Sequence, residues 1–272
     1  MYQGFYTIAS GVLMQERAIN VLSNNMVNAN TPGYKATRLV GTTFEEQLLR
    51  VENRKAEVIG KSVPISVISE VPTRFDSDSL VQTERALDVA INGEGFFRIR
   101  ATNVNVDDAD GDATNADDAD DALLEDGQYY LTRNGNFDID EEGYLVLRGV
   151  GRVQGRTGDL MVARSTITID ANGAVYAENG QYLDTIDLIV PGEGEELERV
   201  GNSLFQLAEG AEGAQAEQAE LFQGQLERSN VDMNREYTLV MEAQRAFQAC
   251  STALQILDRV NQQAAQQIAA LS

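Results

Sequence analysis

The sequence predicts an α+β fold, in which long N- and C-terminal helices pack as a coiled-coil base that carries a mostly antiparallel β central domain. Two observations predict the helices: apolar residues recur at alternating steps of three and four over the first thirty residues, and again over the last forty. A third observation predicts the sheet, because the middle of the chain consists of short alternating apolar segments separated by glycine-containing turns.

The first thirty residues are predicted to form an amphipathic helix of about 25 residues. This helix should end at Asn30-Thr31-Pro32-Gly33, since a residue before proline is disfavoured in the α region and Pro-Gly suits a type II turn. The stripe that we expect to contact other helices consists of Phe5, Ile8, Val12, Ile19, Leu22 and Met26. Four asparagines near the helix end serve either as local caps or as contacts between subunits: Asn24, Asn25, Asn28 and Asn30.

The segment from Asp232 to Leu271 contains no glycine or proline and is predicted to be one long helix. At 1.5 Å per residue, about 40 residues would span roughly 60 Å, which exceeds a small domain. Asp232 is a suitable N-cap, and Glu236 stands in the first turn, where the helix dipole favours a carboxylate. Three heptad columns are apolar except at Asn261: Val240, Phe247, Leu254, Asn261 and Ile268; Ala243, Cys250, Leu257, Ala264 and Leu271; and Leu239, Ala246, Ala253 and Val260. Taken alone, this pattern fits an intramolecular coiled coil or helical hairpin as well as packing against several helices.

Between the helices, glycine punctuates alternating apolar segments. Residues 87–91 and 96–99 are expected to form a hairpin around Gly93 and Gly95, which supply positive φ angles. This glycine spacing lacks the third glycine, the following helix and the lysine of a nucleotide-binding loop, so turn glycines are the better interpretation.

Two turns are predicted on one plan, at residues 140–143 and 170–173. Each opens with Asp and has Gly three residues later, between alternating apolar residues. Further strands are expected at residues 63–71, from Tyr129 onwards, and at 186–190.

Residues 107–126 contain nine Asp, one Glu and no Lys or Arg, which favours a solvated, disordered acidic loop. Asp108, Asp110 and Asp112 have the spacing of calcium ligands. The EF-hand template then requires Gly at its sixth position and Glu at its twelfth, and these are Ala113 and Ala119 here. We expect this loop to be exposed and its deletion to leave assembly intact.

Composition excludes several classes of function. The chain has no histidine, which removes most acid–base and metal-ligand chemistry at neutral pH. Its net charge of −22 argues against nucleic acid or anionic lipid as a partner. Cys250 lies in a heptad column, where a small buried hydrophobe is the expected role. The 272 residues contain no run of apolar residues long enough to span a membrane and no visible Sec-type signal peptide.

The best candidates for catalysis are four carboxylates close together in the sequence: Asp138, Asp140, Glu141 and Glu142. The first two alternate out from one strand face, and the other two lie on the turn. We therefore interpret these carboxylates as solvated turn residues and not as a glycosidase-like catalytic pair. The residues predict no catalytic, cofactor-binding or metal-binding site.

Several stretches, in order along the chain, resemble signature sequences of the bacterial flagellar rod and hook protein family. They are SNNMVNANTPGYK at 23–35, LDVAINGEGFF at 87–97, YLTRNGNF at 130–137, and LERSNVD at 226–232 followed by MEAQRAFQA at 241–249. Val27 is a minor departure from the small apolar residues usual at its position. The residues that carry the resemblance are Asn24, Asn25, Asn28, Asn30, Thr31, Gly33, Tyr34, Gly93, Gly95, Phe97, Arg133, Gly135, Ser229, Asn230, Val231, Asp232, Gln244 and Arg245.

The resemblance implies a rod subunit, distal or proximal, that polymerises through its terminal helices into a torque-transmitting tubular shaft without an active site or cofactor. Its partners would be copies of itself, other axial (rod or hook) proteins and the flagellar type III export apparatus. That apparatus would deliver the chain to the flagellar basal body without a cleaved signal peptide, and the subunit would not insert into the membrane. A hook or hook-like axial subunit is the alternative within the family. An acidic calcium-binding surface protein is the alternative from another class.

The sequence also predicts a division into domains. Residues 1–34 and 229–272 would form the helical assembly domain, and residues 35–76 a connector. The β-rich outer domain would comprise residues 77–208, with the acidic loop at 105–127, and residues 209–228 would be the return linker.

Overall fold

The computed structural model describes residues 2–43, 66–70, 73, 75, 79–102, 127–163, 166–192, 197–201, 203–207, 213–216 and 219–270. The chain divides into two compact units. Unit 1 is drawn from Met1–Ala29, Ala36–Phe75 and Val231–Ser272, and unit 2 from Asn30–Lys35 and Asp76–Asn230. Unit 1 holds the two terminal helices and unit 2 holds antiparallel sheets. The predicted α+β class, with terminal helices and a central antiparallel sheet domain, is confirmed.

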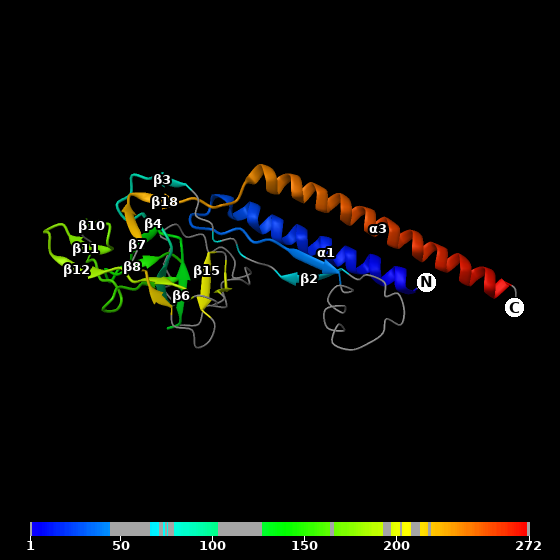
Figure 1. Ribbon diagram of the computed structural model, residues 1–272, viewed down its shortest axis with the longest axis horizontal. Coiled ribbons are helices and arrows are strands. Elements are labelled where there is room, and N and C mark those ends of the chain that lie inside the picture. Colours follow the sequence, from blue (N-terminus) through cyan, green and yellow to red (C-terminus); the bar gives the residue numbers. More distant parts are fainter. Residues whose placement is uncertain are drawn as a thin grey trace. The chain divides into compact units, whose positions relative to one another are not determined.

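Unit 1 is built on two long helices, α1 (Tyr2–Val27) and α3 (Met233–Ala270), which lie side by side (Figure 1). A 3-10 helix, η1 (Asn28–Asn30), follows α1, so the helical stretch ends just before Pro32 as predicted. The strands β1 (Val40–Thr43) and β2 (Ser66–Glu70) pair antiparallel, and β2 contacts α1.

The two helices of unit 1 run antiparallel and in a fixed register. The Asn25 side chain donates a hydrogen bond to Glu236, and a Cβ on Gly11 would lie 3.6 Å from the sulfur of Cys250. Each step back along α1 is therefore matched by one step forward along α3, which places Tyr2 opposite Arg259. The segment from Val260 to the end of α3 extends beyond the first residue of α1, by roughly 16 Å at 1.5 Å per residue.

Unit 2 consists of short antiparallel strands. Their bounds are β3 (Leu80–Gln82), β4 (Val89–Asn92), β5 (Phe96–Ala101), β6 (Tyr129–Thr132), β7 (Phe137–Ile139), β8 (Leu145–Leu147), β9 (Gly151–Val153), β10 (Ile167–Ile169), β11 (Ala174–Ala177), β12 (Tyr182–Thr185), β13 (Leu188–Val190), β14 (Leu197–Arg199), β15 (Leu204–Leu207), β16 (Ala214–Gln215), β17 (Glu220–Gln223) and β18 (Gln225–Glu227). The largest sheet has the order β14-β15-β6-β5-β9-β8-β7, and β13 joins it by pairing with β5 and β16. Smaller sheets are β10-β11-β12, β17-β4 and β18-β3.

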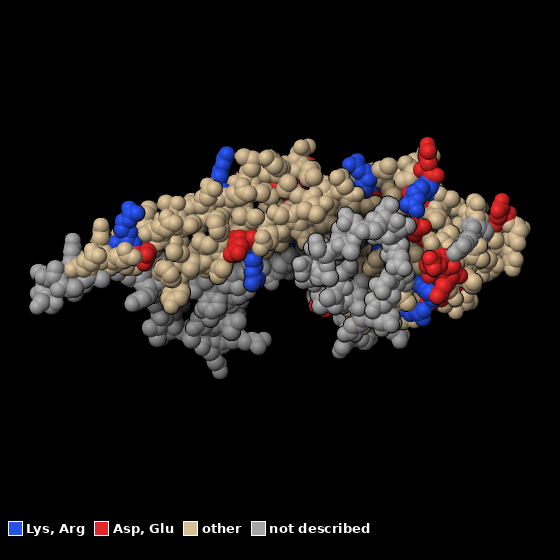
Figure 2. Space-filling model, turned by 180° about the vertical axis from the view of Figure 1, so that it is seen from behind, with Lys and Arg blue, Asp and Glu red and all other residues tan. Residues whose placement is uncertain are grey.

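One apolar core lies between these sheets. It draws fully buried side chains from the large sheet, such as Phe97, Ile99 and Phe137, together with Val175 of β11 and Leu221 of β17. Charged side chains gather over the β-rich unit on the face shown in Figure 2, whereas the helices show few charges on that face.

The predicted hairpin at residues 87–99 is wrong, because β4 and β5 do not pair with each other. Gly93 and Gly95 do have positive φ angles, of 112° and 141°. The chain nevertheless turns from one sheet into another: β4 pairs with β17, and β5 has β6 on one side and β9 and β13 on the other. Both edges of β5 are already occupied, so its sequence neighbour has to find a partner more than 100 residues away.

The two turns predicted on one plan are confirmed. Gly143 and Gly173 have φ angles of +89° and +82°, and their N–H groups donate to the carbonyl oxygens of Asp140 and Asp170. Each aspartate also accepts a backbone N–H with its side chain. Unit 2 also contains strands in the stretch expected to be a return linker, since β16, β17 and β18 all lie between residues 209 and 228.

Candidate functional site

Segments from four separate parts of the sequence meet around the carboxylate of Glu227, at the end of β18. Lys35 Nζ lies 2.7 Å from Glu227 Oε1, and the Arg133 guanidinium donates to Glu227 Oε2 over 3.3 Å. Arg133 also donates to the carbonyl oxygen of Gly93 at 2.7 Å. The side chains of Lys35 and Glu227 are fully buried, and that of Arg133 is 5% exposed. We call Lys35, Gly93, Arg133 and Glu227 the buried junction.

The junction places one carboxylate between two cations. Burial lowers the pKa of Arg133, and this is opposed by the charge and hydrogen bond of Glu227 and by the charge of Glu94. A charge removed from water costs several kcal/mol unless it is paired and hydrogen-bonded. The two cations share Glu227 as their ion-pair partner among the described residues, which makes this carboxylate the most sensitive position of the junction.

Gly33 lies directly against the backbone of Arg133. Its φ angle of +66° is left-handed, and its N–H donates to the carbonyl oxygen of Glu227 at 2.9 Å. A Cβ at this position would lie 2.3 Å from the carbonyl carbon of Arg133. Glycine meets both the conformational and the steric demand.

The residue after this glycine, Tyr34, is fully buried. The Arg199 guanidinium stacks over its ring at 4.5 Å from the centroid and donates to the carbonyl oxygen of Lys35 at 3.2 Å. The N–H of Asn230 donates to the Tyr34 carbonyl oxygen. Residues 33–35 follow α1 and η1 in the chain, and residues 227–230 precede α3. The junction therefore fastens together, within unit 2, the segments that lead out of one terminal helix and into the other.

Three more signature residues pack the core behind the junction. A Cβ on Gly135 would lie 1.7 Å from the Val89 carbonyl oxygen, and the Val89 N–H donates to the Gly135 carbonyl oxygen at 3.0 Å. Phe97 is fully buried and meets Phe137 edge to face, with ring centroids 5.0 Å apart. Gly95 is buried at the corner between β4 and β5. These residues close the sheets over the apolar core.

A second buried polar group, in unit 1, is centred on Asn25. Its amide nitrogen donates to the Thr37 carbonyl oxygen at 2.9 Å and to Glu236 Oε2 at 3.2 Å, and its amide oxygen accepts the Thr37 N–H at 3.1 Å. Asn25 is fully buried and Glu236 is 3% exposed. This amide joins the end of α1, the start of α3 and the strand-like segment that leads to β1. Of the two roles weighed for the asparagines, Asn25 therefore serves the subunit's own fold.

Replacing Asn25 by alanine is expected to lower the free energy of unfolding of unit 1 by about 2–4 kcal/mol, because Glu236 and the Thr37 N–H each lose a buried hydrogen bond. Urea unfolding followed by the helical circular dichroism signal measures this loss. Asn20→Ala is the matched control, since Asn20 is exposed on the same helix. An equal stability of the two variants would show that the Asn25 group is not a structural clamp.

Other signature residues lie at helix ends and on the surface. Asp232 caps α3, as predicted: its Oδ1 accepts the N–H groups of Asn234 and Arg235 at 3.0 and 3.3 Å. Ser229 is buried, whereas Gln244 and Arg245 are exposed on α3. Asn28 is buried and donates to Asn24, and these contacts are local to the helix end. Thr31 accepts the N–H of Tyr34, Asn30 is exposed, and Val231 is half-buried.

The predicted interface stripes occupy a range of environments. The half-buried members are Ile8, Val12, Ile19, Leu22, Met26, Leu239, Val240, Phe247, Leu254 and Leu257. Phe5 and Val260 are exposed, at 39% and 49%. The Ile268 side chain and Leu271 lie outside the described residues. Cys250 is half-buried against Gly11, in agreement with a packing role. The assignment of these stripes to contacts between subunits stays a prediction.

Sequence reasoning did not single out Lys35, Glu227 or Arg199 as site residues. Lys35 and Glu227 lie inside two of the signature stretches, where a charged residue looks like a surface residue. Lysine is scarce, at Lys35, Lys55 and Lys61. The presence of one of these lysines within a signature stretch was the feature that could have identified Lys35 as a site residue. Arg199 carried no signal, because its role comes from stacking on a distant tyrosine.

Three of the four carboxylates considered for catalysis, Asp138, Asp140 and Glu142, are engaged in ion pairs. Burial would raise the pKa of Asp138, but hydrogen bonds from Arg148 and from the Ile139 N–H outweigh burial and lower it. Arg152 pairs with Asp140 and with Glu142. A general acid needs a raised pKa, so Asp138 has the wrong shift for that role. Among the described residues no group of acidic or thiol side chains is arranged to hold a metal ion. The proposed calcium ligands at 107–126 lie outside them.

Comparison with known proteins places these features in one family. The model of the family described as "Flagella basal body rod protein" matches residues 5–35, and that of "Flagellar basal body rod FlgEFG protein C-terminal" matches residues 223–267. The chain belongs to the flagellar basal-body rod family. The first match covers most of α1 and the Gly33–Lys35 segment, and the second covers Glu227 and most of α3. The two matched regions therefore contain Lys35 and Glu227, which form an ion pair in the buried junction.

Relatives of this rod-family chain match along nearly its whole length. The flagellar hook-basal body complex protein FlhO of Bacillus subtilis (strain 168) is 29% identical over 98% of this chain and 99% of the relative. The flagellar basal-body rod protein FlgG of the same organism is 27% identical, over 97% and 98% of the two chains. FlgF of Caulobacter vibrioides is 26% identical, over 92% and 91%. No helix within the described part of the chain is long and apolar enough to cross a membrane.

Proposed function

We propose that this chain is a structural subunit of the flagellar basal-body rod. The observation that carries the proposal is the position of the two family matches, which fall on the two long helices and on the segments that the buried junction fastens together. Full-length relatives named as rod proteins support the same function. A hook subunit and an acidic calcium-binding protein are less favoured, because neither is needed to account for these matches.

We further propose that the helices assemble with other copies into a tubular shaft, in which they pack in coiled-coil fashion. The end of α3, from Val260 onwards, lies beyond α1 in the register described above. An isolated helical segment of this length is marginal in water, so neighbouring subunits are the natural source of its packing partners. Torque would pass between subunits through these helices. The fold would then need no active site.

The proposal places the protein in the basal body with other flagellar rod proteins as partners. Self-association, export by the flagellar type III apparatus and the absence of a cleaved signal are parts of the same proposal, supported by family membership. Deleting the gene in the source bacterium should abolish motility and rod completion, and the full-length chain supplied in trans should restore both.

Deletion of residues 260–272 is expected to separate folding from assembly. The deleted segment lies beyond α1, so the stability of the subunit should change by less than about 0.5 kcal/mol, as for surface changes. The polymer should be lost, because the deleted residues contribute only to contacts between copies. Circular dichroism measures the first quantity, and sedimentation velocity of the purified proteins measures the second.

A full-length variant with Gln262→Ala and Gln266→Ala is the control, since both glutamines are exposed in the same segment. It should assemble like the unmodified chain. Undiminished assembly of the truncated chain would contradict a role for the end of α3 in the shaft.

A further inference from the structure

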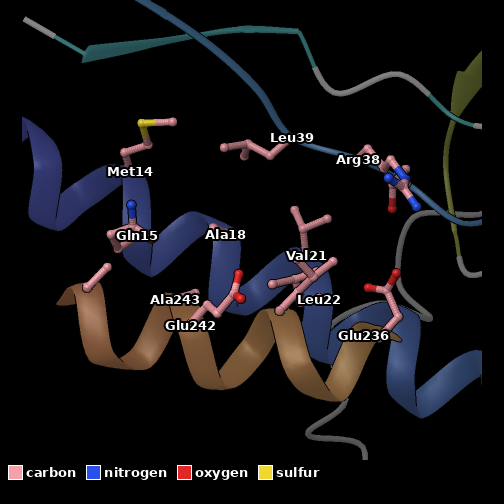
Figure 3. Close-up of a pocket in the computed structure, with 13 residues that line it drawn as sticks. Met14, Gln15, Ala18, Val21, Leu22, Arg38, Leu39, Glu236, Glu242 and Ala243 are labelled. Atoms are coloured by element: carbon pink, nitrogen blue, oxygen red, sulfur yellow. The ribbon is translucent and has the colours of Figure 1, made fainter. Parts of the chain in front are cut away.

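A groove runs between α1 and α3 and is bordered on its third side by residues 37–39 (Figure 3). Its volume is about 370 Å³, within the range of pockets that bind a small group of side chains. Its walls are largely apolar, with Ala18 and Leu22 from α1, Leu239 and Ala243 from α3, and Leu39 from the third side. Two carboxylates of α3 also line it: Glu236, which accepts a hydrogen bond from Asn25, and exposed Glu242.

Arg38 lines this groove, and its side chain forms no ion pair or hydrogen bond with any residue that the structure describes. Its side chain is half-buried, and its Nε is shielded from solvent without an acceptor. A shielded guanidinium nitrogen without a partner costs about 1–3 kcal/mol or more. We therefore expect a molecule bound in the groove to contribute both apolar side chains and a hydrogen-bond acceptor for Arg38. A carboxylate is the strongest acceptor for a guanidinium.

The described arginines of the two units differ in how often they form ion pairs. In the described part of unit 2, five of the nine arginines form an ion pair with a described carboxylate: Arg98, Arg100, Arg133, Arg148 and Arg152. In the described part of unit 1, none of the arginines forms an ion pair: Arg17, Arg38, Arg235, Arg245 and Arg259. The carboxylate of Glu16 is likewise without an ion-pair partner among these residues. Within the described part of unit 1, charges of both signs are thus present without an ion-pair partner among the described residues.

The opposite side of α1 offers the matching groups. At about 100° per residue, Leu13 and Glu16 lie roughly 140–160° around the helix from the groove residue Ala18. This outer face carries Tyr6, Leu13 and Val27, which are 61%, 61% and 79% exposed. Exposed Glu16 lies on the same face, and Arg17 and Asn20 are exposed beside it.

We propose that the outer face of α1 in one copy docks into the groove of a second copy, with Leu13 against the apolar walls and the Glu16 carboxylate paired with Arg38. The proposal rests on the proposed rod function and names the contact through which copies join. The two patches lie on opposite sides of one helix, so the contact is head-to-tail. Such heterologous contacts repeat without closing and produce a helical filament.

Charge reversal tests the pair. Glu16→Arg and Arg38→Glu should each weaken assembly of the full-length chain by about tenfold or more in the concentration needed, because like charges then meet in the contact. The double variant should return to within about threefold of the unmodified chain, since the pair is restored with reversed sign. Glu198→Arg, on an exposed strand position of unit 2, is the control and should assemble normally. Circular dichroism checks that each variant is folded.

Cysteine cross-linking tests the placement without relying on charge. In a Cys250→Ser background, a mixture of the Leu13→Cys and Leu39→Cys proteins should form a disulfide-linked dimer of one chain of each. A mixture in which Tyr182→Cys replaces Leu39→Cys should not, although Tyr182 is 52% exposed.

The outcomes separate this contact from the function itself. If the unmodified chain polymerises, single charge reversals that leave polymerisation unchanged, or a missing Leu13→Cys/Leu39→Cys disulfide, would overturn the groove contact and leave the rod function standing. A failure of the double variant to recover would overturn the Glu16–Arg38 pairing. Failure of the unmodified chain to polymerise at any concentration would overturn the assembly proposal and this contact with it.

Discussion

Glu227→Gln is expected to lower the free energy of unfolding of unit 2 by about 3–5 kcal/mol, the cost of breaking a buried ion pair by removing one partner. Glu227 is the carboxylate that faces both Lys35 and Arg133, and all three side chains are buried. Glutamine keeps the size of the side chain but removes the negative charge that faces both buried cations. Its amide NH₂ group is a hydrogen-bond donor, and it would face the donor groups of Lys35 or Arg133. Because whole domains are stable by only about 5–15 kcal/mol, unit 2 should become marginal.

Lys35→Met is the informative comparison for this prediction. It removes one cation, and the remaining Arg133–Glu227 pair is balanced in charge. Methionine is close in shape to the lysine stem, so Lys35→Met should cost clearly less than Glu227→Gln. Glu198→Gln removes one negative charge at an exposed position and should stay within about 0.5 kcal/mol of the unmodified chain.

Urea unfolding followed by near-ultraviolet circular dichroism measures these differences, since Tyr34 and Tyr130 are packed in unit 2. If Lys35→Met proved as damaging as Glu227→Gln, the excess of positive charge would not govern the junction. The loss should also be visible as an earlier exposure of residues 30–35 in hydrogen exchange, because the junction holds this segment to β18.

The terminal helices could be predicted because their signal is local. A spacing of three and four specifies a helix within a few turns, and Asp232 caps α3 within its own neighbourhood. The turns at Asp140 and Asp170 were predictable for the same reason, as aspartate and glycine act within four residues.

Pairing between distant strands could not be predicted in this way. The segment 87–99 contains two strands around a glycine-rich corner, which is also the sequence of a hairpin. Its actual partner β17 lies more than 100 residues away, and the choice depends on β6, β9 and β13 already covering both edges of β5. No residue within segment 87–99 indicates which strands will cover β5 or which strand will pair with β4.

The buried junction shows the same limit for charged residues. Gly33 and Arg133 belong to separate signature stretches, and the sequence does not reveal that their backbones touch. Lys35 and Glu227 are separated by 192 positions and read as ordinary surface charges until the fold buries them together. On α1 the sequence identifies an apolar stripe, but the exposure of Leu13 on the other side became evident only once the groove-lining side was known.

Gly33→Ala is expected to destabilise unit 2 by more than about 3 kcal/mol. A left-handed φ angle costs a non-glycine residue about 1–3 kcal/mol, and at Gly33 the added Cβ would also overlap the Arg133 carbonyl carbon at 2.3 Å. The neighbour is backbone, not the end of a flexible side chain, so it cannot rotate away. Relief requires the 30–35 segment to move outward, which breaks the hydrogen bond from the Gly33 N–H to Glu227 and draws Lys35 away from its carboxylate.

Gly180→Ala separates the two contributions. Gly180 has a similar φ angle of +76°, but a Cβ there would meet nothing within 4 Å. It should therefore show the conformational cost alone, about 1 kcal/mol. Calorimetry of both variants should find a much larger loss for Gly33→Ala, and combining Gly33→Ala with Glu227→Gln should cost less than the two losses added, since both act on the same junction. Equal losses at the two glycines, or full additivity with Glu227→Gln, would mean that Gly33 contributes only its backbone conformation and does not hold the junction closed.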